Sequence, residues 1–280
     1  MMYAKKSLGQ NFLKSGSALR AIIVAGDIKP TDTILEIGPG KGALTAKILE
    51  TGAKVIAVEK DRDLIPFLEA KFKTYIESGQ FVLIEGDILE MNVVEIFDKV
   101  SKCLSVLAGK GNTKKPNNLT PSHTYKLIAN IPYYITGEII RKYFEEKMQP
   151  EKMVLLVQKE VALRIVARDN KASILSIACK AYSTPRYVQT VKRDAFNPAP
   201  NVDSAIIAFE NINKDLFEKN KTPEARFFEV MKLGFAHKRK KLGGNLKEIK
   251  ESLNQVKLKQ IKDKRPENLT VSDWIELIKQ

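Results

Sequence analysis

The residues best suited to chemistry lie in short turns that follow β-branched runs of the chain. The first such turn is glycine-rich, with Gly38-Pro39-Gly40-Lys41-Gly42 after Thr33–Ile37 and ahead of a helical pattern. Glycine permits a sharp turn and lets a ligand approach the backbone closely. One such turn is weak support by itself, because dinucleotide enzymes, methyltransferases and plain loops all use it. Here the spacing is GxGxG, one residue short of the dinucleotide pattern, and Glu36 precedes it. This spacing favours S-adenosylmethionine, which has no pyrophosphate to be held.

Two carboxylates follow at the ends of the next two strand-like runs. Glu59 ends Lys54–Glu59, roughly 20 residues after the first glycine, where acids in such folds hold both ribose hydroxyls. Asp87 follows Phe81–Glu85, and there it can accept a hydrogen bond from the adenine amino group. Either acid alone could cap a helix or lie on the surface. Because three such features follow consecutive runs, we predict one cofactor site that includes Gly38, Glu59 and Asp87.

The fourth run is followed by Asn130-Ile131-Pro132-Tyr133, whose groups suit an aromatic amine. An exocyclic adenine amino group is a poor nucleophile because its lone pair is delocalised into the ring. Acceptors for both N–H groups, the Asn130 side-chain oxygen and the Ile131 carbonyl, would favour a pyramidal nitrogen whose lone pair points at the methyl group. Pro132 stiffens the turn, and Tyr133 offers a face for base stacking. A plain turn with a core tyrosine is the alternative.

A proline-rich stretch, Phe196–Ser204, has two interpretations. Its prolines set an extended, rigid path, which would place Phe196 as the opposite wall of a base-stacking pocket. The stretch is also compatible with a loop that enters an edge strand, and both interpretations can hold together.

Transfer from a sulfonium is an in-line displacement that needs no strong base. Positioning would therefore supply most of the rate, on the order of 7–11 kcal/mol in favourable cases.

These turns require a sheet that brings the ends of its strands together. The first two-thirds of the chain alternates β-branched runs with helical patterns, which is typical of a parallel sheet with crossover helices. Tyr187–Val191 and Ala205–Phe209 follow, and they predict an antiparallel addition at the sheet edge. The predicted fold class is α/β, a Rossmann-like, mostly parallel sheet with an antiparallel edge. Its parallel strands are Thr33–Ile37, Lys54–Glu59, Phe81–Glu85, Tyr125–Ala129 and Met153–Gln158, and its helices include Gly42–Glu50, Asp63–Tyr75 and Gly137–Lys147.

The charge balance points to a polyanionic partner. Lysine and arginine number 47 against 33 acids, a net charge of +14, and Lys238–Arg265 holds eleven basic and three acidic residues. Such an excess is typical of proteins that bind nucleic acid or an anionic membrane, although a solvated lysine-rich surface is the alternative.

No apolar run approaches the roughly 20 residues of a membrane span, so we expect a cytoplasmic protein. Cys103, Cys179, His123 and His237 are isolated, so we predict neither a metal site nor a disulfide.

The chain is predicted to divide at about residue 210. Only helical patterns remain from Asn211 on, at Glu224–Gly234, Leu246–Leu253 and Val271–Lys279. We therefore predict a cofactor-binding catalytic domain over residues 1–210 and a small helical domain over residues 211–280. Residues 101–124 contain four lysines and no acid, and a loop of this length is usually functional or disordered. We interpret it as a mobile basic insertion that is either disordered or in contact with RNA.

Together the motifs resemble the KsgA/RsmA family of small-subunit ribosomal RNA adenine dimethyltransferases, which is related to the Erm resistance methylases. The similarity runs nearly from end to end. It includes LGQNFL at Leu8–Leu13, ILEIGPGKGALT at Ile34–Thr45, VEKD at Val58–Asp61, EGDIL at Glu85–Leu89, NIPYYIT at Asn130–Thr136, LVQKEVALRI at Leu156–Ile165, FNPAPNVDS at Phe196–Ser204, FAHKRKKLGGNL at Phe235–Leu246 and RPENLTVSDW at Arg265–Trp274.

The resemblance implies S-adenosylmethionine as cofactor, RNA binding by the helical domain and a target base between Tyr133 and Phe196. It implies two adjacent N6,N6-dimethyladenosines near the 3′ end of 16S rRNA, made within the 30S subunit or its precursor. No protein partner is implied, and we expect a monomer. Residues 101–124 and Gly243-Gly244 depart from the family pattern, and the two glycines are expected to soften a helix. The implied cofactor contacts are Asn11, Leu13, Gly38, Glu59, Asp87 and Asn130.

Three other functions stay open at this point. An Erm-type enzyme would methylate large-subunit rRNA, but LGQNFL and the basic tail favour the small subunit. A non-catalytic RNA-binding or assembly factor would keep the fold, although intact Asn130–Tyr133 and Glu59 argue against lost chemistry. A small-molecule methyltransferase would not need a basic tail.

Overall fold

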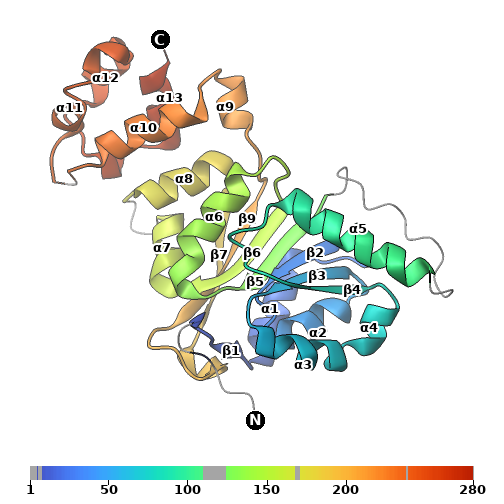
Figure 1. The fold of residues 1–280 in the computed structure, drawn as a ribbon. Coiled ribbons are helices and arrows are strands. Elements are labelled where there is room, and N and C mark those ends of the chain that lie inside the picture. The colour runs from blue at the N-terminus through green and yellow to red at the C-terminus, as the bar shows by residue number, and fades with distance from the viewer. Residues whose placement is uncertain (1–4, 6–7, 110–123, 168–170, 238, 280) are drawn as a thin grey trace. The chain divides into compact units, whose positions relative to one another are not determined.

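The computed structural model describes residues 5, 8–109, 124–167, 171–237 and 239–279, and Figure 1 shows their arrangement. Its strands are β1 (Phe12–Leu13), β2 (Thr33–Ile37), β3 (Lys54–Glu59), β4 (Phe81–Glu85), β5 (Lys126–Asn130), β6 (Lys152–Gln158), β7 (Thr184–Val191), β8 (Phe196–Asn197) and β9 (Ser204–Glu210). Its α-helices are α1 (Gly16–Gly26), α2 (Ala43–Leu49), α3 (Ile65–Lys71), α4 (Lys73–Glu77), α5 (Val93–Gly109), α6 (Thr136–Glu145), α7 (Lys159–Val166), α8 (Ile174–Tyr182), α9 (Asp215–Lys219), α10 (Glu224–Gly234), α11 (Leu242–Asn245), α12 (Gln255–Ile261) and α13 (Val271–Ile278).

Among the described residues, seven strands form the central sheet in the order β4-β3-β2-β5-β6-β9-β7. Strands β2 to β6 pair in parallel, and β9 is antiparallel to β6. Ile37 pairs with Val58 and Glu59 pairs with Glu85, so the carboxyl ends of β2, β3 and β4 lie at one edge. The predicted α/β class with an antiparallel edge is confirmed. The five predicted parallel strands match β2 to β6 within one residue at each end.

Helices cover both faces of this sheet, which is why its strands are apolar on both sides (Figure 1). Ile206 and Ala208 of β9 belong to the same core cluster as Ile22 of α1. The next residue, Phe209, faces the other way, and its ring meets Phe144 of α6 with centroids 5.5 Å apart. Each such buried side chain contributes roughly 1.5–3 kcal/mol to folding. The sheet is therefore a rigid support for the turns at its edge.

A second, two-stranded sheet joins the start of the chain to residues far along it. β1 and β8 are antiparallel, with Phe12 opposite Asn197 and Leu13 opposite Phe196. The Lys14 amide extends this pairing by donating to the Ala195 carbonyl at 2.8 Å. The N-terminal segment is thereby held beside the edge where β2 to β5 end.

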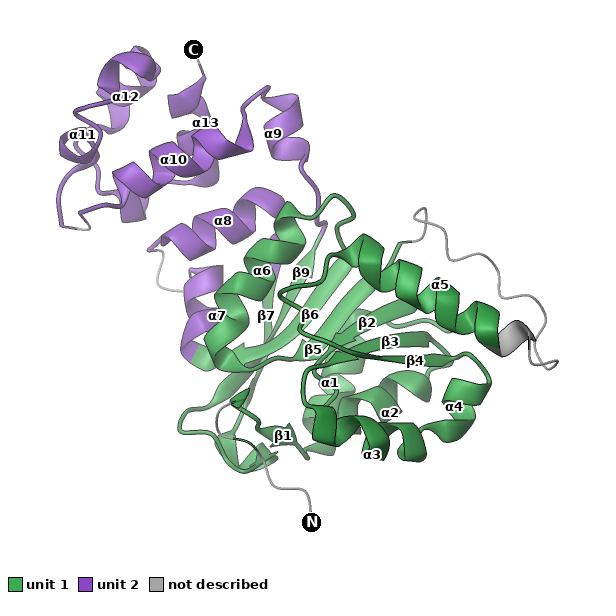
Figure 2. Cartoon of the chain, in the orientation of Figure 1, with its two compact units in different colours: residues 1–159, 186–210 green, residues 160–185, 211–280 purple. Residues whose placement is uncertain are grey.

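The chain forms two compact units, one of residues 1–159 and 186–210 and the other of residues 160–185 and 211–280 (Figure 2). The division differs from the predicted one in residues 160–185, which were expected in the first domain. These residues group with the helical unit because α8 packs there. The Tyr182 ring stacks on Phe228 with centroids 5.9 Å apart, and its hydroxyl donates to Glu224 at 2.5 Å.

Two predicted segments are wrong in part. Helix α5 extends to Gly109, so residues 101–109 are helical instead of loop, because Phe97, Val100 and Leu104 recur at helical spacing and are buried. Residues 110–123 of the predicted insertion lie outside the described residues. Leu246–Leu253 was predicted to be a helix but does not form an α-helix. Its backbone makes tight turns, in which the amide of residue i+3 donates to the carbonyl of residue i, and these turns bury Leu246 and Leu253.

Gly243 and Gly244, which were expected to soften a helix, fall in the short helix α11. The Gly243 amide donates to the Lys262 carbonyl at 2.9 Å, and an added Cβ would lie 3.0 Å from the Lys262 Cβ. Glycine at this position thus lets α11 pack directly on the end of α12. None of the helices in the described part of the chain is long and apolar enough to cross a membrane.

Candidate cofactor and substrate site

A cavity of about 340 Å³ lies where β2 to β5 end and where the N-terminal segment crosses. This volume is within the usual range for a small-molecule site, about 300–1,000 Å³. Nine of the ten residues predicted for the site line this cavity. They are Asn11, Leu13, Gly38, Glu59, Asp87, Asn130, Ile131, Pro132 and Tyr133.

The glycine-rich turn forms the floor beside β2. Gly38 has a φ of +63° and Gly42 has a φ of +71°, the left-handed region that favours glycine. A Cβ on Gly38 would meet nothing within 4 Å, whereas one on Gly42 would lie 2.4 Å from the Phe72 ring. The Gly38 amide donates to the Val58 carbonyl at 2.9 Å, which fixes the turn to the end of β3. The turn is therefore packed on one side and open toward the cavity on the other.

Glu59 is held as a preset acceptor at the end of β3. The side chain is 5% exposed, and its two oxygens accept from the Gly40 amide at 3.0 Å and the Asp61 amide at 2.8 Å. Burial raises the pKa of Glu59, and these backbone donors oppose the shift. Each oxygen keeps a lone pair, so the carboxylate can accept from two neighbouring hydroxyl groups.

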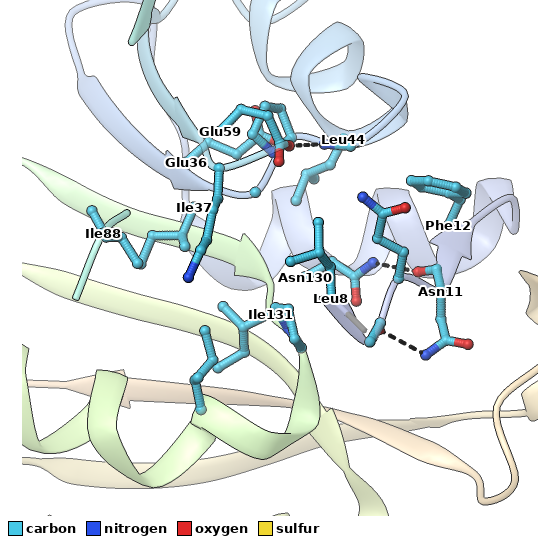
Figure 3. A pocket seen from close by; sticks show the side chains of 18 of the residues that line it. Leu8, Asn11, Phe12, Glu36, Ile37, Leu44, Glu59, Ile88, Asn130 and Ile131 are labelled. Carbon is cyan, nitrogen blue, oxygen red and sulfur yellow. Dashed lines mark hydrogen bonds between the residues drawn. The ribbon is translucent and has the colours of Figure 1, made fainter. Parts of the chain in front are cut away.

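Glu36 stands beside Glu59 and has an unpaired oxygen (Figure 3). It is 1% exposed, and its Oε2 has no hydrogen-bond partner among the described residues. Burial raises the pKa of Glu36 to about 8. A buried carboxyl oxygen that lacks a partner and lines a cavity calls for a donor or a positive charge from the ligand. A cofactor with an ammonium and a sulfonium group fits this requirement.

Asp87 is an ionised acceptor that lines the cavity after β4. Burial by itself would raise its pKa, but Lys60 and the Leu89 amide hold the pKa below the ordinary value. Lys60 Nζ lies 2.5 Å from Oδ2, and the Leu89 amide donates to Oδ1 at 3.0 Å. Asp87 thus remains an acceptor facing the cavity near neutral pH.

Asn130 is oriented by the N-terminal segment. Its Nδ2 donates to the Asn11 carbonyl at 3.1 Å, and Figure 3 shows the amide directed at that carbonyl. Its Oδ1 accepts no hydrogen bond from the described residues, so the oxygen is free for a ligand. The half-buried Tyr133 follows three residues later, and its hydroxyl lies 2.5 Å from Ser204 Oγ. Burial raises the pKa of Tyr133, so its hydroxyl is neutral.

The structure does not bring Phe196 to the cavity. The side chain is 2% exposed and packs in the core cluster with Leu13 and Val191, while the next residue, Asn197, lines the cavity. The prediction of Phe196 as a pocket wall is corrected for this reason. Its ring packs in that core cluster with Leu13, its partner across the small sheet.

Several lining residues were missed from the sequence. Phe12 packs under Gly40 and has Lys41 Nζ 4.9 Å from its ring centroid. Glu36 belongs to the ILEIGPGKGALT motif and Phe12 to the LGQNFL motif. Both lie next to residues that were assigned to the site, and this position could have identified them from the sequence. In the described residues, no group of three or more His, Cys, Asp or Glu side chains is placed to hold a metal ion.

Comparison with known proteins identifies the family. The model of the ribosomal RNA adenine dimethylase family matches residues 1–280. A ribosomal RNA small subunit methyltransferase A of Dehalococcoides mccartyi (strain CBDB1) is 41% identical over 239 residues, which cover 85% of this chain and 73% of the relative. That of Fusobacterium nucleatum subsp. nucleatum is 37% identical over 284 residues, with 98% and 96% covered.

Among solved structures, a dimethyladenosine transferase from Plasmodium falciparum aligns with a TM-score of 0.73 at 26% identity and covers 95% of both chains. The resemblance found in the motifs is thus confirmed at the level of the whole chain. The chain belongs to the ribosomal RNA adenine dimethylase family and is an S-adenosylmethionine-dependent enzyme that dimethylates adenine in ribosomal RNA.

Proposed function

We propose that this enzyme methylates N6 of two adjacent adenosines near the 3′ end of 16S rRNA, on the 30S subunit or its precursor, during ribosome biogenesis. The names of the two bacterial relatives, both small subunit methyltransferases, support this target. The observation that carries the proposal is the state of Asn130. Its amide nitrogen is engaged by Asn11, which leaves the amide oxygen as a fixed acceptor at the cavity.

The cofactor contacts are assigned from the donors and acceptors of the lining residues. Glu59 accepts from both ribose hydroxyls, and Asp87 accepts from the adenine amino group of the cofactor. The Gly38 turn, Asn11 and Leu13 enclose its methionine part. Glu36 was not assigned a contact from the sequence, and its unpaired oxygen suits the ammonium group.

The methyl transfer depends on how the target amine is held. When bound, S-adenosylmethionine supplies a methyl group on a sulfonium that already carries its leaving group. The Asn130 oxygen and the Ile131 carbonyl accept from the two N–H groups, which localises the lone pair on nitrogen. Tyr133 stacks on the base and keeps it in line with the methyl group. No residue has to act as a strong base, because the proton is lost after attack.

The two compact units would have different functions. We assign methyl transfer to the unit of residues 1–159 and 186–210 and RNA binding to the helical unit. Lys259, Lys262 and Lys264 in the helical unit are exposed and form no ion pair with the described residues. They are available for phosphate contacts. We further propose that the protein acts as a cytoplasmic monomer.

The proposal is tested by offering the purified enzyme 30S precursors lacking the modification and 23S rRNA, with methyl incorporation located by mass spectrometry. Dimethylation of two adjacent adenosines in 16S rRNA is expected. Asn130→Ala should lose transfer by at least about 10²-fold, since an electrostatic contact made at the reacting group is removed. Its fold should persist, as judged by circular dichroism and a cooperative thermal unfolding transition. Transfer confined to 23S rRNA would refute the small-subunit target, and near wild-type activity of Asn130→Ala would refute the amine-binding role.

A further inference from the structure

Asp61 is a buried carboxylate that lies behind the cofactor cavity without lining it. Its side chain is 3% exposed. Lys5 Nζ lies 2.5 Å from Oδ1, and Gln10 Nε2 donates to Oδ2 at 2.7 Å. Gln10 in turn accepts from the Lys5 amide at 2.8 Å. One carboxylate therefore holds both ends of the segment that leads into the cavity wall.

Residues 8–14 form that wall, and we call them the strap. All seven line the cavity. The far end of the strap is fixed by β1, which pairs with β8, and by the Lys14 amide, which donates to Ala195. Its middle is fixed by the Asn11 carbonyl, which accepts from Asn130. The near end is fixed by Asp61. The strap is therefore tied at each end and once between. At its near end Asp61 holds Gln10 of the strap by a hydrogen bond and Lys5, just ahead of the strap, by an ion pair.

Asp61 also touches the proposed ribose acceptor. Its backbone amide donates to Glu59 Oε1 at 2.8 Å, while its side chain holds the strap. The position of the strap is thus joined to the position of Glu59 through one residue. Burial by itself would raise the pKa of Asp61, but Lys5 and Gln10 hold it below the ordinary value, so the carboxylate stays charged near neutral pH.

We propose that Asp61 is a positioning residue that keeps the strap closed over the bound cofactor and thereby sets how fast S-adenosylmethionine and S-adenosylhomocysteine leave. The inference rests on the proposed cofactor site. Dimethylation of two adenosines needs repeated exchange of spent for fresh cofactor, so the opening rate of the strap enters every cycle. Asp61 and Lys5 do not line the cavity, so a change in either acts on the cofactor only through the strap or Glu59.

The test compares Asp61→Asn and Lys5→Ala with Asp63→Asn as a matched control. Asp63 also pairs with Lys5, at 2.6 Å, but its side chain is 71% exposed and, unlike Asp61, it makes no hydrogen bond to Gln10 of the strap. Lys5 is 40% exposed. Its removal leaves the core intact, so this variant keeps the test valid should Asp61→Asn fold poorly. Dissociation of S-adenosylhomocysteine is measured by surface plasmon resonance, and amide hydrogen exchange of residues 8–14 is followed by mass spectrometry.

Both test variants should release S-adenosylhomocysteine about tenfold faster, the effect of removing one charge-assisted hydrogen bond. Exchange of the strap amides should rise in parallel. KM for S-adenosylmethionine should rise by a similar factor while the single-turnover rate of methyl transfer stays within about twofold, because no group at the reacting atoms is touched. Asp63→Asn should match the wild type in all three measurements.

Two results overturn the inference. Unchanged dissociation rates in both test variants would remove the role of Asp61 in retention. Faster strap exchange with unchanged dissociation would reduce Asp61 to a structural anchor. Failure of the cofactor site itself gives a different signature, since the wild-type enzyme would then show no binding of S-adenosylhomocysteine.

Discussion

At the scale of single residues, Glu36 couples protonation to stability and to binding. Its pKa is about 8 in the folded protein against an ordinary 4.5. Between these values the folded state holds a proton that the unfolded state has released, so the free energy of unfolding should fall as pH rises from about 4.5 to about 8. Glu36→Gln removes this contribution. Urea unfolding at pH 5, 6.5 and 8 should show the variant gaining stability relative to wild type as pH rises.

A cationic cofactor should draw the proton off Glu36. Calorimetric titration in two buffers of different ionisation enthalpy should therefore show proton release on binding near pH 7 in the wild type and less in Glu36→Gln. In the urea experiment, parallel curves of unfolding free energy against pH for the wild type and Glu36→Gln would contradict the raised pKa of Glu36.

At the scale of elements, the turn between β2 and α2 requires glycine at position 42. Gly42 is the N-cap residue of α2 and has a φ of +71°, and a Cβ there would lie 2.4 Å from the Phe72 ring. Gly42→Ala should lower the free energy of unfolding by about 1–2 kcal/mol through backbone strain, and by about 1–3 kcal/mol more through overpacking. Chemical denaturation measures this decrease.

The matched control is Gly137→Ala in the first turn of α6. Its Cβ would meet nothing within 4 Å. The change should be neutral or stabilising by up to about 1 kcal/mol, since alanine favours a helix. Equal stabilities for the two variants would show that the conformation of the glycine turn is not required.

At the scale of the whole molecule, the excess of +14 should govern RNA affinity. The logarithm of the binding constant should fall steeply with the logarithm of salt concentration. Changing Lys259, Lys262 and Lys264 together to Gln should reduce the slope by about 0.7–0.9 for each phosphate that the enzyme no longer neutralises. Fluorescence anisotropy with a 16S rRNA fragment at several salt concentrations measures the slopes.

The control for charge alone changes Lys29, Lys47 and Lys73 to Gln. These lysines belong to the other unit, and each pairs with an acid close to it in sequence. These three substitutions alter the net charge by the same amount, and they should leave the salt dependence of RNA binding near that of the wild type. Equal slopes for the two triple variants would argue for a diffuse charge effect instead of a phosphate-binding surface in the helical unit.

The sequence by itself determined the strands, the turns at their ends and the residue types offered there. β2 to β6 could be predicted because runs buried on both faces are continuous and apolar, a property of a few adjacent residues. Since carboxyl ends of parallel strands meet at one edge, Gly38, Glu59, Asp87 and Asn130 could be expected together from their places along the chain. The family motifs added Asn11 and Leu13.

Tertiary structure alone decided what depends on residues far apart in the chain. Phe196 is buried by its packing in the core cluster, and Asn130 is oriented by the Asn11 carbonyl. The partners of Asp61 and the assignment of residues 160–185 to the helical unit also depend on contacts between residues far apart in the chain. Local patterns encode periodicity and turn chemistry. They do not encode which distant segment covers a side chain, because that depends on how the whole core packs.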